Sequence, residues 1–361
     1  MCIFAHMYGY ESLQNHLFLI LYGGVTMLAF IAAVYLWLRR ANAIAPAVTP
    51  PKALRVWTAA FFLTVALSHV WWYVLGIHWL TEDRMIRNLT AITLDRITLV
   101  PLMMAVLQSV LQDRRHRIWP WLLAHVPIVI VFAVGIAGHD PYHLLEVLDY
   151  WQMGVIFVFI IYYIYSLLKY NRWLRENYAD LEHKEVWQSM LLVTVLSVIF
   201  EGYTTNTGEM AREFFSQFFS LLIIAILLWR IETLQQLEAV EEEKVEAPKG
   251  IDIGALLRQA CEDKHFYLQH DLTLQQLAIC IGTNRTYLSH YFAQQGITYN
   301  AYINRLRIEH FIRLYHENKD TMPATTAVML AKQSGFHSYS TFSAAFKKHI
   351  GTTVSEWMKG V

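Results

Sequence analysis

Residues 272–296 read LTLQQLAICIGTNRTYLSHYFAQQG, and this stretch decides how the C-terminal part of the chain folds. Apolar residues recur at helical spacing up to Ile281, and Gly282 then supplies the residue type that tight turns favour. Asn284 can cap a second helix starting near Arg285, because its side-chain oxygen can accept a backbone N–H of the first turn. The stretch therefore predicts two short helices joined by a tight turn.

The same plan returns in residues 327–351, AVMLAKQSGFHSYSTFSAAFKKHIG, with Gly335 at the turn and Ser338 as the cap. Between the two copies, residues 299–317 (YNAYINRLRIEHFIRLYHE) carry apolar residues at helical spacing and predict one connecting helix. Two such units joined by one helix can place two helices in successive major-groove segments on one face of DNA.

Residues 272–357 resemble the DNA-binding domain of the AraC/XylS family of bacterial transcription regulators. The resemblance rests on LA…G…YLSHYF…G, YINRLRIE and LAKQSGF.S.STFS.AFKK..GTTVSEW, and it covers about a quarter of the chain. It implies a fold of seven helices with two helix-turn-helix units, and double-stranded promoter or operator DNA as the partner. A homodimer is the form expected on DNA.

The family's pattern also implies DNA-binding residues on the second helix of each unit, where a solvated helix face is the alternative. In the first unit they are Arg285, Thr286, Ser289 and His290. In the second unit they are Tyr339, Ser340, Ser343, Lys347 and Lys348, of which the two lysines hold phosphate and fix position without reading sequence. The residues expected in the core are Leu277, Leu288, Phe292, Phe336, Phe342 and Phe346.

The chain departs from the family at several positions. The family often has Arg where this chain has His290 and Ala344, and it usually has Pro where Val354 stands. The connection around NKDTMPATT is also longer than usual. Each lost base contact is worth about 1–3 kcal/mol, so we expect weaker DNA affinity per subunit, raised by dimerisation or another docking surface.

The rest of the chain has the composition of a membrane protein. Of the 361 residues, 55% are apolar and only 16% are charged, and the mean hydropathy is +0.31. Soluble proteins carry roughly 25% charged residues. Seven windows approach the roughly 20 apolar residues that a span needs. They are Leu17–Leu38, Ala53–Gly76, Leu89–Leu111, Trp119–Ala137, Trp151–Leu168, Val186–Gly202 and Phe214–Trp229.

The charges between these windows predict the topology. Eleven Lys and Arg residues lie on the side of the first, third and fifth loops: ten in the loops themselves, and Arg55 just inside the second window. The N-terminal segment and the other loops hold three, Arg84, Arg87 and Arg212. The positive-inside rule then places the N-terminus outside and the segment after Arg230 in the cytoplasm. The expected protein is all-α, a seven-transmembrane-helix bundle followed by a cytoplasmic double helix-turn-helix domain, in a bacterial cytoplasmic membrane.

The predicted domains are a transmembrane sensor domain over residues 1–230, a charged helical linker over 231–250 and a DNA-binding domain over 251–361. In the linker, Ile231, Leu234, Leu237 and Val240 recur every three residues, so the last span plausibly continues as a helix. A solvated connector and a short signalling coiled coil both remain open for this segment.

Polar residues inside the predicted spans are expensive, so they are candidates for a function. With the topology above, the outer half of the bundle holds His69, Asp95, Arg96, Glu201 and Gln217. These residues could line a cavity, open to the periplasm, for a small polar or zwitterionic ligand. They could instead pair within the membrane as structural glue, or the span boundaries could be misplaced. Because Asp95 and Arg96 are adjacent and point about 100° apart on a helix, each is expected to pair with another span.

Other chemistry has little support in the sequence. His69 and His125 could ligate haem, but no companion motif supports this, and the seventh span has no Lys for a retinal Schiff base. Cys2, Cys261 and Cys280 form no CxxC pair, so a metal site is not expected. We therefore predict a membrane-bound transcription regulator that is not an enzyme and needs no cofactor. The alternative is a receptor or transporter-like protein whose C-terminal domain binds other proteins.

Overall fold

The computed structural model describes residues 13–46, 48–76, 82–138, 141–203, 210–237, 252–318 and 326–360. Within these residues the chain forms helices and no β-strand, so the predicted all-α class is confirmed. Contacts divide the chain into two compact units. Unit 1 is Met1–Leu168 with Val186–Ala239, and unit 2 is Lys169–Glu185 with Val240–Val361.

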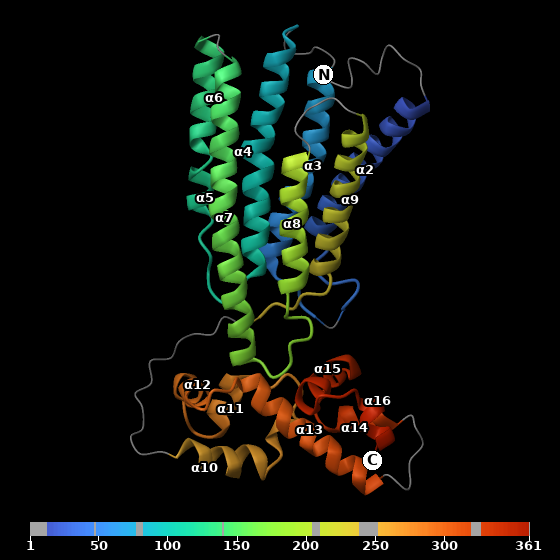
Figure 1. Cartoon of the computed structure of the whole chain (residues 1–361), viewed down its shortest axis with the longest axis vertical. Helices are drawn as coiled ribbons and strands as arrows, with labels where there is room; N and C mark the ends of the chain where they lie inside the picture. Colours follow the sequence, from blue (N-terminus) through green and yellow to red (C-terminus); the bar gives the residue numbers. More distant parts are fainter. Residues whose placement is uncertain are drawn as a thin grey trace. The chain divides into compact units, whose positions relative to one another are not determined.

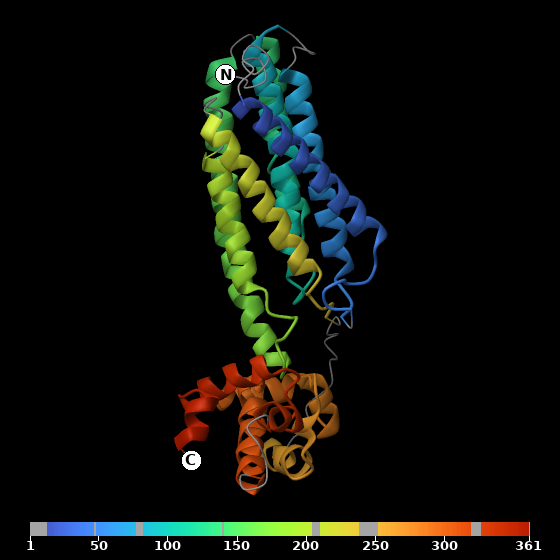
Figure 2. The ribbon, with the colours of Figure 1, turned by 90° about the vertical axis from the view of Figure 1, so that its right-hand side faces the viewer.

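Unit 1 is a bundle of long helices that run side by side (Figure 1). Helices α2, α3, α4 and α9 pack on one another, and α2 is inclined to its neighbours (Figure 2). The end of α7 belongs to unit 2. The helices are α2 (Leu13–Leu38), α3 (Lys52–Gly76), α4 (Arg84–Val110), α5 (Trp119–Leu123), α6 (Val126–Gly138), α7 (Pro141–Asn177), α8 (Trp187–Tyr203) and α9 (Met210–Ile231).

Five of these helices are long and apolar enough to cross a membrane, by length and composition. They are His16–Leu38, Lys52–Gly76, Ile86–Val110, Val147–Asn177 and Phe214–Ile231. The other two windows fall on shorter apolar helices, Trp119–Gly135 and Trp187–Ile199. In the first of these, α5 ends at Leu123 and α6 begins at Val126, where Pro127 cannot donate a backbone hydrogen bond. Seven spans therefore remain a prediction.

The predicted continuation of the last span as a helical linker is wrong for the described residues. Helix α9 ends at Ile231, and residues 232–237 fold back on the loops of unit 1. The Glu232 carboxylate accepts a hydrogen bond from the Ala43 N–H and lies 3.3 Å from the Arg55 guanidinium. Leu234 and Leu237 are 0% and 8% exposed, so they fill unit 1 instead of forming a coiled-coil seam. Val240 lies outside the described residues.

Unit 2 contains the helix-turn-helix pattern that the sequence predicts. Its helices are α10 (Ile253–Leu257), α11 (Leu274–Cys280), α12 (Arg285–Gln294), α13 (Tyr299–Asn318), α14 (Thr326–Gln333), α15 (Tyr339–Ile350) and α16 (Val354–Gly360). Helix α10 continues into a π-helical turn at Arg258–Glu262, and a 3₁₀ turn follows at Phe266–Leu268. The seven α-helices among the described residues match the number that the family resemblance implies.

Helices α11 and α12 lie on one side of α13, and α14, α15 and α16 lie on the other (Figure 1). Each group forms an apolar core with α13. The first packs α11 and α12 against α13, and the second packs α14, α15 and α16 against it. All six predicted core residues are buried in these clusters: Leu277, Leu288, Phe292, Phe336, Phe342 and Phe346. Burial raises the pKa of the Cys261 thiol in the first core to about 12, which makes it a poor nucleophile at neutral pH.

Arg307 on α13 ties the two cores together. Its side chain is 1% exposed, and it donates hydrogen bonds to the backbone oxygens of Tyr267 at 2.8 Å and Gln269 at 2.6 Å. Its guanidinium also lies 5.7 Å from the centre of the Phe336 ring in the second core. A buried guanidinium needs such partners, because an unpaired buried charge is strongly destabilising.

Candidate nucleic-acid interface

Helix α12 presents the first set of predicted DNA-binding residues. Gly282 adopts a left-handed φ of +74°, and the Asn284 side chain caps α12 by accepting the Tyr287 N–H at 2.9 Å. Thr286 and His290 are exposed, Ser289 is half-buried, and Leu288 faces the core. The turn chemistry read from the sequence is therefore confirmed, and α12 offers a polar outer face.

Helix α15 repeats the arrangement in the second unit. Gly335 has a φ of +88°, and the Ser338 hydroxyl caps α15 by accepting the Thr341 N–H at 3.3 Å. Tyr339 and Ser340 are exposed and Ser343 is half-buried, while the neighbouring Phe342 is fully buried. One face of α15 is therefore in the core, and the groove residues that the family's pattern implies lie outside it.

Lys347 and Lys348 lie exposed in the last turn of α15, which ends at Gly351 with a φ of +89°. Positive charge is favourable at a helix C-terminus. Both ammonium groups are also free of burial, as phosphate contacts require. Ala344, where the family often has Arg, is exposed on the same helix, so an arginine there would fit without repacking the core.

Among the contacts of the described residues, Arg285 is the predicted DNA-binding residue that is bonded to a residue outside the two helix-turn-helix units. It is half-buried, and its Nε donates to the Asn177 side-chain oxygen at 2.7 Å. The Thr341 hydroxyl on α15 similarly donates to the Glu182 carboxylate at 3.3 Å. Asn177 is the last residue of α7, and Glu182 lies in the segment that follows it. No pattern in the sequence predicts these two contacts.

The polar residues in the helices of unit 1 make a network that joins α3, α4 and α9. His69 Nε2 lies 2.9 Å from the Gln217 side-chain oxygen. Asp95 accepts hydrogen bonds from the Ser68 hydroxyl at 2.6 Å and the Trp72 indole N–H at 2.7 Å. These contacts bring three of the predicted sensing residues to one region.

Arg96 pairs with the Asp149 carboxylate on α7, so Asp95 and Arg96 each pair with a different helix, as predicted. The side chain of Glu201 lies outside the described residues, as does the connection at 319–325. His69 Nδ1 lies 2.8 Å from the Val65 carbonyl oxygen, so both of its ring nitrogens are engaged within the bundle.

The family model described as "Helix-turn-helix domain" matches residues 277–360. No curated protein and no solved structure matches the chain. The match begins within α11 and includes α12, α13, the second helix-turn-helix unit and the caps described above. The C-terminal quarter of the chain is therefore an AraC-type helix-turn-helix domain. A protein that carries such a domain is a DNA-binding transcription regulator, and DNA is its partner.

Proposed function

We propose that the protein is a membrane-bound, one-component transcription regulator of a bacterial cytoplasmic membrane. The observation that carries this proposal is the joining, in one chain, of an AraC-type helix-turn-helix domain and a bundle with five helices of membrane-spanning length. Such a chain can couple a signal at the membrane to a promoter without a phosphorelay. A coupling free energy of about 1–3 kcal/mol changes occupancy about 5–150-fold.

The surface of unit 1 supports insertion in a bilayer. Large apolar side chains such as Ile20, Trp37, Phe157 and Leu168 are between 65% and 73% exposed on its helices. Soluble proteins rarely expose apolar surface on this scale. Among the positive charges predicted to be cytoplasmic, Arg39, Arg40 and Lys52 fall at or beyond the ends of these helices.

The composition of unit 2 favours an even number of membrane crossings between the end of α7 and the DNA-binding domain. The segment Lys169–Glu185 and the C-terminal domain form one compact unit, so both must lie on the same side of any membrane. Helix α9 is long enough to cross. Helix α8 must then cross as well, although its 17 residues span only about 26 Å at 1.5 Å per residue.

The proposed signal acts on the polar network of His69, Asp95, Arg96 and Gln217, with Glu201 as a further candidate. Because this network joins α3, α4 and α9, a small polar ligand that competes for one of its hydrogen bonds would change how these helices pack. The same network without a ligand would act as structural glue. Substituting Gln217 by Leu and measuring ligand-dependent transcription separates these roles.

The DNA-binding domain is proposed to act as a homodimer in the cytoplasm. Each chain has two helices for two major-groove segments, and a dimer doubles the number of contacts. This doubling offsets the arginines replaced by His290 and Ala344.

The test uses the full-length protein in lipid nanodiscs, since Ala179 belongs to a core of the DNA-binding unit. We would select bound sequences from random DNA at fixed salt, and repeat the selection with Tyr339→Ala and His290→Ala. An enriched bipartite motif that changes in these variants, but not in the exposed-site control Ser355→Ala, is the expected result. Absence of any enriched motif would overturn the proposal and favour a C-terminal domain that binds other proteins.

A further inference from the structure

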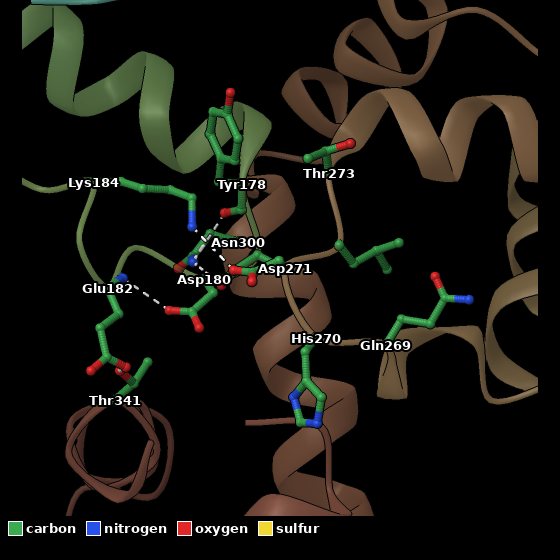
Figure 3. A network of polar contacts seen from close by, with 12 residues as sticks. Tyr178, Asp180, Glu182, Lys184, Gln269, His270, Asp271, Thr273, Asn300 and Thr341 are labelled. Carbon is green, nitrogen blue, oxygen red and sulfur yellow. Dashed lines mark hydrogen bonds and ion pairs between the residues drawn. The ribbon is translucent and has the colours of Figure 1, made fainter. Parts of the chain in front are cut away.

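The segment Asn177–Lys184, here called the strap, connects α7 to α8 and belongs to unit 2. Its backbone is hydrogen-bonded to the DNA-binding domain (Figure 3). The Ala179 N–H donates to the Leu272 carbonyl at 3.1 Å, and Tyr178 forms an isolated antiparallel bridge with Thr273. The Asn300 side-chain amide on α13 donates to the Ala179 carbonyl at 2.7 Å.

An ion pair fixes the far end of the strap. The Lys184 ammonium lies 3.1 Å from the Asp271 carboxylate, and the Lys184 side chain is only 3% exposed (Figure 3). Between the two anchors, Asp180 accepts the Glu182 N–H at 2.9 Å, and His183 adopts a φ of +61° that L residues rarely occupy. The turn is therefore shaped by the surface on which it lies.

The strap also contacts both helices that are expected to enter the major groove, α12 and α15. Asn177 accepts the Arg285 Nε–H at 2.7 Å at the first residue of α12. Glu182 accepts the Thr341 hydroxyl at 3.3 Å in the first turn of α15 (Figure 3). One short segment thus engages the N-terminal end of each helix that is expected to enter the major groove.

These contacts use the groups that DNA would need. A guanidinium and a hydroxyl at helix N-termini are typical donors to DNA phosphates and base edges. The Glu182 carboxylate carries the same sign of charge as a phosphate and accepts from the same kind of donor. A DNA phosphate and the Glu182 carboxylate would therefore repel each other at the start of α15.

We propose that the strap is an intrachain competitor of DNA: it covers Arg285 and Thr341 in the resting protein and must leave α15 before the second helix-turn-helix unit can bind. The proposal rests on the proposed function and adds the means of its regulation. The backbone contacts of Tyr178 and Ala179 keep the strap attached, while the hydrogen bond between Glu182 and Thr341 is the part that breaks.

The strap also changes the expected route of the signal. The exit segment after α9 folds back on unit 1 through Glu232, Leu234 and Leu237, as described above. Helix α7, in contrast, is continuous up to Asn177, where the strap begins. A rotation or shift of α7 would therefore reach Asn177 without passing through the exit segment.

The test compares two substitutions that remove the same charge three positions apart. Glu182→Gln weakens the contact with Thr341, whereas Glu185→Gln removes a carboxylate that pairs with Arg175 at 3.4 Å. Binding of the selected DNA to full-length protein in nanodiscs is measured at fixed salt. We expect Glu182→Gln to bind about three- to tenfold more tightly than the unsubstituted protein, and Glu185→Gln to bind within twofold of it.

Equal or weaker DNA binding by Glu182→Gln would overturn the competitor role while leaving the regulator itself intact. An equal gain in both variants would also overturn it, because the gain would then come from net charge alone. If neither the unsubstituted protein nor any variant binds a DNA sequence, the proposed function fails and this inference fails with it.

A second measurement fixes the strap in place. In a background with Cys2→Ser and Cys280→Ser, Glu182→Cys and Thr341→Cys are joined by a short bis-methanethiosulfonate reagent. Each thiolate displaces methanesulfinate and forms a reducible disulfide. Cys280 is replaced because it is exposed and would react, whereas Cys261 is buried. We expect cross-linking to reduce DNA binding at least tenfold and reduction to restore it. Full binding by the cross-linked protein would show that the strap and DNA do not compete.

Discussion

The two helix-turn-helix units follow the same plan but differ in how each core is completed. The first core includes Ala179 from the strap, which is 1% exposed among Leu272, Leu277 and Tyr299. The second core draws all its described members from residues 308–358. The core of the first helix-turn-helix unit is therefore completed by a segment between α7 and α8, whereas the described core of the second comes from the C-terminal domain. We therefore expect the strap to stay attached to the first helix-turn-helix unit and to be released from the second.

The largest expected effect comes from breaking the first core at the strap. Ala179→Asp would bury an unpaired carboxylate, which we expect to destabilise the first unit by about 3–5 kcal/mol. Hydrogen exchange in nanodiscs measures this as faster exchange of α11 and α12, with little change in α15 and α16. Ala345→Asp on α15, where the side chain is only partly buried, is the control for a general effect of charge. Equal loss of protection in both units would contradict the comparison.

The two turn glycines, Gly282 and Gly335, differ in how closely other atoms approach them, which gives a second comparison of the two helix-turn-helix units. A Cβ at Gly335 would lie 2.8 Å from the Leu268 carbonyl oxygen, whereas a Cβ at Gly282 has nothing within 4 Å. Both residues have positive φ, which disfavours any L side chain by about 1–2 kcal/mol. We expect Gly335→Ala to destabilise its unit by about 3 kcal/mol, because overpacking adds to the strain, and Gly282→Ala by about 1–2 kcal/mol. Hydrogen exchange of α15 and α12 measures both.

If Gly282→Ala destabilised its helix-turn-helix unit as much as Gly335→Ala, the close approach to Leu268 would not explain the larger loss of stability expected at Gly335. The close approach matters because Leu268 precedes α11 and Gly335 precedes α15. This contact and the Arg307 hydrogen bonds hold the two helix-turn-helix units in a fixed relation to each other. Two helices that enter successive groove segments require such a relation.

The local features of these units could be predicted from the sequence because their signals are local. Gly282, Asn284, Gly335 and Ser338 announce turns and caps through their own backbone and side-chain chemistry. The six core positions follow from helical periodicity. The separate pairing of Asp95 and Arg96 follows from their angular spacing on a helix, although neither partner could be named.

The strap and the exit segment could not be predicted, for different physical reasons. Ala179 meets Leu272 through backbone hydrogen bonds, which any residue can make, so no side-chain pattern marks the contact. In the exit segment, Leu234 and Leu237 have the spacing of a helix but are buried in unit 1 after a turn at Glu232. There the burial of apolar side chains prevailed over helical periodicity.

A smaller effect is expected from giving each unit the arginine that related domains carry. His290→Arg on α12 and Ala344→Arg on α15 both add a positive charge at an exposed position. Each should tighten DNA binding by about 1 kcal/mol at low salt and steepen the salt dependence by about 0.9 per phosphate contacted. If the strap restrains the second unit, Ala344→Arg gains less than His290→Arg in the resting protein. The same gain from Ser355→Arg on α16 would attribute the effect to net charge.

The smallest effect concerns two capping boxes with the same geometry and different chemistry. At α11, Thr273 and Gln276 exchange hydrogen bonds at 2.9 and 3.2 Å; at α16, Thr353 and Glu356 do so at 3.0 and 3.3 Å. The hydrogen bonds from Thr353 lower the pKa of Glu356.

The pKa of Glu356 is lower in the folded protein. Its contribution to the stability of the fold is therefore complete above the ordinary pKa of Glu, about 4.3, and is lost as the pH falls through the lowered value. Gln276 does not titrate, so acid should reduce the hydrogen-exchange protection of α16 while that of α11 stays constant. Glu356→Gln should make the two boxes alike and abolish the pH dependence of α16. If α16 still loses hydrogen-exchange protection in acid in that variant, another carboxylate is responsible. The two helix-turn-helix units would then differ in acid stability for a reason other than their capping boxes.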